Sequence, residues 1–263
     1  MSTALVPTRG YLTGQRREII ARSVAASLVG AVPLPFLDDW AIGAILGAGY
    51  RHVAAAHQID LDPDAVKALV FGDTSAPSIV EMAGSAIAVR LVGRTARRMA
   101  IAMVLVNRAR QAARTFLTMT LFDHYCAKLH RGGALDAPTA RALRLEIGRA
   151  IDATPGALAL HPFRKGLVAA ARASLRTPLR LADFASRGAI RRLLSRKSDV
   201  DDAEAVDDLE AALERALAEK SNVFARAVAS VEANLSAEGN PFLDSAIESM
   251  DMRWRARLAV EPK

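Results

Sequence analysis

The hydrophobic and polar positions of this chain follow the spacing of helices. Apolar residues recur three, four or seven positions apart, which predicts amphipathic helices. The clearest stripe consists of Val206, Leu209, Leu213, Leu217, Phe224, Val228, Val231 and Leu235. No run of β-branched residues alternates with polar ones, so the pattern predicts no strand. We therefore expect an all-α fold.

The most apolar stretch, residues 22–56, predicts a helical hairpin packed with the longer amphipathic helices. Pro33 and Pro35 remove two backbone donors and separate its two halves. The second helix is expected to begin at Asp38 or Asp39. A short carboxylate there can accept the free N–H groups of the first turn and suits the helix dipole.

Gly43 and Gly47 give this second helix a small face, which allows another backbone to approach closely. The face fits either tight packing in a soluble core or contact with a membrane. A straight membrane-spanning helix is not expected, because each buried acid would cost about 2.5–3.5 kcal/mol near the bilayer centre. A shallow hairpin in the membrane stays an alternative.

Caps, prolines and glycines predict the other helix boundaries. Asp62 before Pro63 is a helix start, and Asp136 with Pro138 opens another. The expected helices cover residues 15–31, 39–57, 63–71, 79–131 with one break, 137–153, 178–194, 202–235 and 241–258. Residues 15–133 would form a helical-hairpin domain. Residues 134–260 would form an amphipathic extension, which either stands apart or packs on the first domain as one unit.

Two sequence motifs carry a family resemblance. The run Val-Pro-Leu-Pro-Phe-Leu-Asp at residues 32–38 precedes a small-residue helix, and Gln-Ile-Asp-Leu at 58–61 follows it. Over about residues 17–132 the chain resembles the YcjF-like and EcsC-like bacterial helical-hairpin domains. The resemblance implies an α-helical domain, often linked to bacterial membranes or to GTPases, with no established catalytic activity.

Composition favours a reducing compartment and an anionic partner. The single cysteine, Cys126, allows no internal disulfide, and residues 1–12 do not read as a signal peptide. The net charge is +7. An excess of this sign favours acidic surfaces such as lipid headgroups or nucleic acid. We expect a cytoplasmic protein, with peripheral attachment to the inner membrane as an extension of that expectation.

Charge is strongly segregated along the chain. Residues 84–131 hold nine Lys or Arg and one acid, and residues 161–197 hold ten and one. Residues 199–219 hold nine acids and one Arg. The acidic helix could pack against the basic ones, or the basic blocks could meet an external anionic partner.

The second basic block has the pattern of an amphipathic helix, which is typical of binding to a membrane surface. One face carries Leu175, Leu179, Ala182, Ala185, Ala189 and Leu193. The candidate residues for anionic-surface binding are Arg172, Arg176, Arg180, Arg187, Arg191 and Arg192. Nucleic acid is disfavoured as the partner, because aromatic residues for base stacking are few.

No motif predicts an active site. A phosphate-binding Gly-rich loop and a His-Glu-x-x-His zinc motif are absent. His52 and His57 are five apart, and His124 and His130 are six apart, so neither pair has the spacing of two ligands on one helix face. The run Asp-His-Tyr-Cys at 123–126 is no triad, because consecutive helical residues point in different directions. We expect no catalytic residue, no metal and no cofactor.

The sequence thus favours a non-enzymatic helical protein that associates peripherally with a membrane or a membrane-bound partner, through the hairpin and the basic helices. The alternative is a soluble helical scaffold with segregated basic and acidic helices. Non-specific nucleic-acid binding is a weaker third hypothesis. Self-association through the stripe of residues 206–235 is compatible with each.

Overall fold

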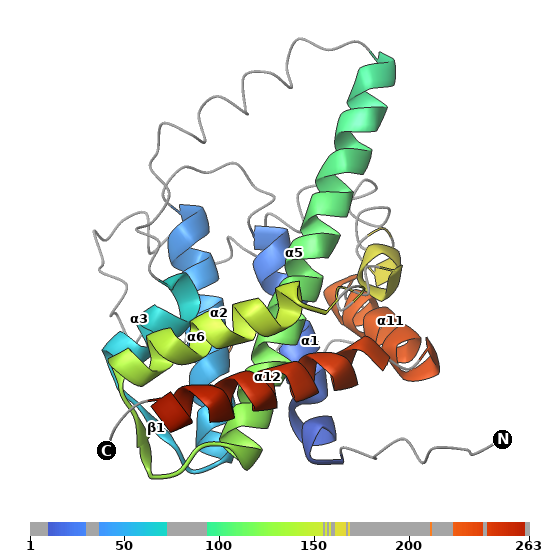
Figure 1. Ribbon diagram of the computed structural model, residues 1–263. Coiled ribbons are helices and arrows are strands. Elements are labelled where there is room, and N and C mark those ends of the chain that lie inside the picture. Colours follow the sequence, from blue (N-terminus) through green and yellow to red (C-terminus); the bar gives the residue numbers. More distant parts are fainter. Residues whose placement is uncertain are drawn as a thin grey trace, which may run out of the picture.

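The chain folds into a set of packed helices, shown by a computed structural model (Figure 1). The structure describes residues 10–29, 37–72, 94–154, 156, 158, 161–166, 168, 211, 223–238 and 241–260. The elements are η1 (Gly10–Leu12), α1 (Thr13–Val29), α2 (Leu37–Ala56), β1 (Asp60–Leu61), α3 (Pro63–Phe71), α5 (Arg94–Lys128), β2 (Ala134–Leu135), α6 (Ala137–Asp152), α11 (Val223–Glu238) and α12 (Pro241–Val260). The all-α fold class is confirmed.

Helices α1 and α2 form part of the core together with α5. Ile19, Ile20 and Val24 of α1 are buried, as are Ile45 and Val53 of α2. Helix α1 packs against α2, α5 and α11. The apolar faces that mark the hairpin in the sequence therefore meet other helices of the same chain.

Helix α2 begins slightly earlier than the sequence predicts. It starts at Leu37, so Asp38 and Asp39 lie in its first turn and neither of them is the N-cap. Acidic residue types in a first turn suit the positive end of a helix dipole, so this helix start is compatible with the sequence. Their side chains and the turn with Pro33 and Pro35 lie outside the described residues.

The small face of α2 packs against α3. A methyl group on Gly43 would lie 2.8 Å from the ring of Phe71, and one on Gly47 would lie 3.1 Å from Val66. Both glycines are buried. Close helix approach inside the protein is therefore what these two residues provide.

Helix α3 spans the predicted residues because its ends carry strong local signals. The Asp62 side chain accepts a hydrogen bond from the Asp64 amide, and Pro63 opens the first turn. Gly72 ends the helix with φ of 65°, and its N–H bonds to the Ala68 carbonyl at 2.9 Å. A positive φ at this position favours glycine.

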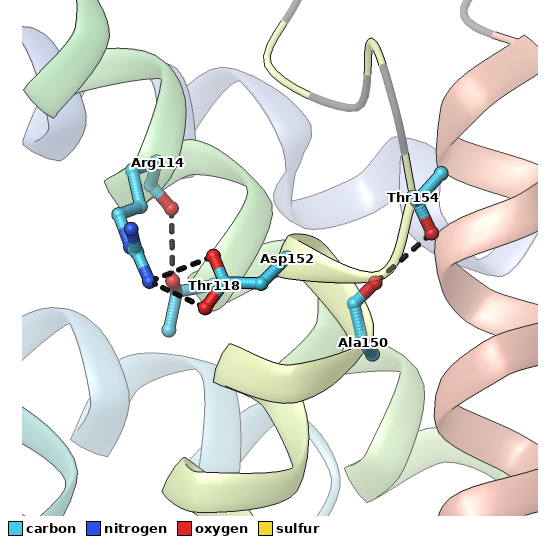
Figure 2. Close-up of polar contacts among 5 residues, drawn as sticks. All are labelled: Arg114, Thr118, Ala150, Asp152 and Thr154. Atoms are coloured by element: carbon cyan, nitrogen blue, oxygen red, sulfur yellow. Dashed lines mark hydrogen bonds and ion pairs between the residues drawn. The ribbon is translucent and has the colours of Figure 1, made fainter.

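Helix α6 packs on α3, α5 and α12 (Figure 1). The Asp136 carboxylate caps it by accepting from the Thr139 amide at 2.9 Å, which confirms the predicted start. At its other end Asp152 pairs with Arg114 of α5 at 3.2 Å (Figure 2). Both side chains of this pair are exposed, so it contributes at most about 1 kcal/mol.

Hydroxyl groups in or just after these helices donate to backbone carbonyls four residues earlier in the chain. Thr118 donates to the Arg114 carbonyl and Thr154 donates to the Ala150 carbonyl, at 2.8 and 2.9 Å (Figure 2). Ser23 does the same with Ile19. These bonds satisfy polar groups that would otherwise be costly to bury.

Helix α11 carries the described half of the long stripe predicted from the sequence. Phe224, Val228, Val231 and Leu235 are buried, and the helix packs against α1. Gly166 allows the 161–166 segment to approach closely, because a methyl group there would lie 3.0 Å from the Ala227 carbonyl oxygen. This half of the stripe is thus used within the chain. Apart from Ala211, which is helical, residues 202–222 lie outside the described residues.

The end of α5 differs from the prediction. The helix ends at Lys128 instead of residue 131, because the His130 amide bonds back to the Tyr125 carbonyl at 2.8 Å. The Gly133 carbonyl then accepts from the Asp60 amide at 2.7 Å, and β1 pairs in parallel with β2. The sequence pattern gave no sign of this two-residue strand pair.

Candidate functional site

Polar side chains gather at the end of the helix bundle where α2 and α5 finish. They are Tyr11 of η1, His57 just after α2, Asp123 and His124 of α5, and Asp251 of α12. We refer to these five residues as the histidine–carboxylate cluster. Four separate segments contribute to it, so only the folded chain brings its members together.

The first part of the cluster is a histidine–aspartate pair. His57 Nε2 lies 2.6 Å from Asp123 Oδ1, and the Asp123 side chain is 0% exposed whereas that of His57 is 21% exposed. The second oxygen of Asp123, Oδ2, is buried and makes no hydrogen bond. Burial raises the pKa of Asp123, while the hydrogen bond and charge of His57 oppose that rise.

The second part of the cluster is a three-residue chain. His124 Nδ1 lies 2.6 Å from the Tyr11 hydroxyl, and Nε2 lies 2.7 Å from Asp251 Oδ1. With a neutral ring and an ionised Asp251, Nε2–H donates to the carboxylate and Nδ1 accepts from the tyrosine. The Lys128 ammonium lies 5.0 Å from the centre of the Tyr11 ring, within the range of a cation–π contact.

Titratable groups next to the cluster are Tyr125 and Cys126, which are buried on α5, and His130, which is partly buried just after α5. The Tyr125 hydroxyl lies 3.1 Å from His130 Nδ1, and burial raises the pKa of Tyr125. Burial, together with the charge of Asp123, raises the pKa of the Cys126 thiol. Burial lowers the pKa of His130, and the nearby Gly132 carbonyl offsets only part of that effect. Their packing makes Tyr125 and Cys126 poor nucleophiles at neutral pH.

The chemistry open to the cluster is proton binding and hydrogen bonding. Within the described part of the chain, no group of three or more His, Cys, Asp or Glu side chains is arranged to hold a metal ion. Adjacent residues on α5 do point apart, as the sequence predicts, since Asp123 meets His57 just after α2 whereas His124 meets η1 and α12. Sequence reasoning missed the cluster because each partner is distant in the chain.

A second candidate site is the first half of α5. Its residues 94–114 include six arginines and no acid: Arg94, Arg97, Arg98, Arg108, Arg110 and Arg114. An eight-residue apolar run, 99–106, separates the first three from the others. Val106, in this run, is 38% exposed. The first turns of α5 extend beyond the other described helices (Figure 1). We refer to residues 94–114 as the arginine half of α5.

The six arginines named from the sequence, between Arg172 and Arg192, lie outside the described residues. No helix in the described ranges is both long and apolar enough to cross a membrane. Comparison of the chain with models of protein families, with curated proteins and with solved structures gave no match.

Proposed function

We propose that this chain is a non-enzymatic protein that associates peripherally with an anionic membrane surface. The observation that carries the proposal is the arginine half of α5, where six cations and an exposed valine occupy a helix segment without any acid. The resemblance to the YcjF-like and EcsC-like domains, which is an expectation from the sequence, agrees with membrane association.

Charge placement supports an external anion. The first turn of α5 contains no acid and includes Arg94 and Arg97, residue types whose positive charge opposes the positive end of the helix dipole. A mismatch of this sign costs about 0.3–1 kcal/mol per residue at low ionic strength. A negatively charged surface at this end of the helix would turn that cost into attraction.

The packing of the hairpin favours surface contact over insertion. The described apolar residues of α1 and α2 already contact other helices. Arg22 and Glu18 of α1 form an ion pair at 2.9 Å, and Arg22 also reaches the Ile45 carbonyl at 3.4 Å. Moving these charges into lipid would be expensive. Electrostatic contact through arginines needs no such rearrangement.

The test is sedimentation of the full chain with vesicles. Wild type should bind vesicles that contain phosphatidylglycerol, bind pure phosphatidylcholine vesicles poorly, and release at high salt because exposed charges are screened. Substituting Arg97, Arg98 and Arg110 by Gln should weaken binding about a hundredfold, since each cation near such a surface contributes about 1 kcal/mol.

The matched control removes the same charge elsewhere. Arg141, Arg149 and Arg255 are exposed on α6 and α12, and their triple Gln variant should bind nearly as wild type does. Equal losses of vesicle binding in the two variants would show that only the net charge matters, and would contradict a role for α5. If wild type ignores anionic vesicles at low salt, the membrane proposal is wrong and the helical-scaffold alternative replaces it.

A further inference from the structure

The histidine–carboxylate cluster contains two carboxylates, each facing one imidazole. Asp123 faces His57, the residue just after α2, and it also lies near His124 and Cys126 on its own helix. Asp251 of α12 faces His124 at 2.7 Å. The cluster therefore fastens α12 and the end of α2 to the same two residues of α5.

The net charge of these four groups depends on the number of protons they hold. With both imidazoles protonated and both carboxylates ionised, the four groups are neutral together. When both imidazoles lose their protons, two negative charges remain. The Asp123 carboxylate is fully buried and its Oδ2 has no partner, so an uncompensated charge there is costly.

We infer that the histidine–carboxylate cluster is a proton-dependent latch, which holds η1, α2 and α12 on the end of α5 and loosens as the pH rises. The hydroxyl of Tyr11 extends the latch to η1 through His124. The Lys128 ammonium lies over the Tyr11 ring, so a cation from α5 also contacts η1.

Asp123 adds a separate proton-linked contribution of the same sign, through its own carboxyl group and not through the imidazoles. Burial raises that pKa above its ordinary value of 3.8, so the folded chain holds a proton there more tightly than the unfolded chain does. The corresponding stabilisation is fully present below the ordinary value and is lost as the pH rises through the raised one. His130, which faces Tyr125, titrates with the opposite sign because burial lowers its pKa.

Trp254 of α12 reports on the latch. It is buried and makes an edge-to-face contact with Tyr125 of α5, with ring centres 5.1 Å apart. The chain has two tryptophans, so a Trp40→Phe variant leaves Trp254 as the single fluorophore. Quenching of its emission by acrylamide measures how often α12 separates from α5.

In the Trp40→Phe chain, quenching of Trp254 should increase several-fold from mildly acidic to mildly alkaline pH, with an unchanged far-ultraviolet circular dichroism spectrum. Adding Asp123→Asn and Asp251→Asn keeps the shape of both side chains but removes their charge, and should abolish the increase. The matched control, Asp64→Asn with Asp152→Asn, removes two exposed carboxylates and should keep it.

Quenching that stays constant with pH in the parent chain would overturn the latch, and so would a full increase in the double Asn variant. If that variant does not fold, Asp251→Asn alone decides the matter, because Asp251 is partly exposed at the edge of the cluster. This single change should reduce the increase by about half, since it removes one of two ionised partners. An undiminished increase would contradict the proposal.

Discussion

Gly49 lies directly against Arg22, because a methyl group on Gly49 would come within 2.7 Å of the arginine Cδ. The same methyl group would also collide with the end of the Met119 side chain. Helices α1, α2 and α5 therefore meet closely at this glycine. The buried guanidinium of Arg22 owes its place between them to the absence of a side chain there.

Gly49→Ala should destabilise the chain. Alanine is the better helix former by about 1 kcal/mol, but overpacking a core typically costs about 1–3 kcal/mol. The net loss should be visible as a lower urea midpoint. Gly148→Ala in α6 is the control, because a methyl group there meets nothing within 4 Å. That change should stabilise by about 0.5–1 kcal/mol. Stabilisation by both changes would contradict the close contact.

Asp136→Ala should cost about 0.5–2 kcal/mol through loss of the α6 cap. The hydrogen bonds from Thr139 lower the pKa of Asp136, so its contribution is present above the ordinary value of 3.8 and is lost as the pH falls through the lowered one. Urea unfolding at neutral pH and near pH 3 should show the wild-type and variant stabilities converging. Asp64→Ala, which removes an exposed carboxylate from the first turn of α3, serves as the comparison.

Cys126 should react slowly with Ellman's reagent in the folded chain. The residue is 8% exposed, and burial together with the charge of Asp123 raises the pKa of the thiol. Reactivity follows the thiolate, so little of the reactive form exists at neutral pH. The measurement is the rate of colour release with and without urea. A native rate close to that of the unfolded chain would show that the end of α5 opens readily.

His130→Gln should remove part of the acid sensitivity of the fold. Burial lowers the pKa of His130, so its contribution is present above the ordinary value of 6.5 and is lost as the pH falls through the lowered value. Glutamine can still bond to the Tyr125 hydroxyl without titrating. The free energy of unfolding of the variant should therefore fall less than that of wild type over this interval. If the free energy of unfolding changes with pH equally in both proteins, protonation of His130 does not destabilise the fold.

Local chemistry predicted the elements that have strong caps. Residues 63–71 were expected as a helix from Asp62, Pro63 and Gly72, and α3 has those bounds. The burial of Phe224, Val228 and Val231 likewise agrees with the spacing of the stripe. Such signals lie within a few residues of the feature they determine, so one sequence is enough to find them.

Local sequence signals do not predict contacts between segments that are distant in the chain. His57 meets Asp123 and His124 meets Asp251 only because α2, α5 and α12 pack at the same end of the bundle. A single histidine or aspartate carries no mark of its partner. The i, i+4 rule applied to the histidines tests one helix at a time, so it could not detect a cluster that draws on four segments.

The parallel pairing of β1 with β2 constrains the order in which the chain assembles. Asp60 and Ala134 are about seventy residues apart, and closing a loop of that length costs roughly 4 kcal/mol of chain entropy. A few backbone bonds, each contributing about 0.5–1.5 kcal/mol net, do not readily offset that cost. The pairing must form after α2 and α5 have docked. The amide of Asp60 should therefore gain protection late in refolding, and should be among the first to exchange when the native state fluctuates.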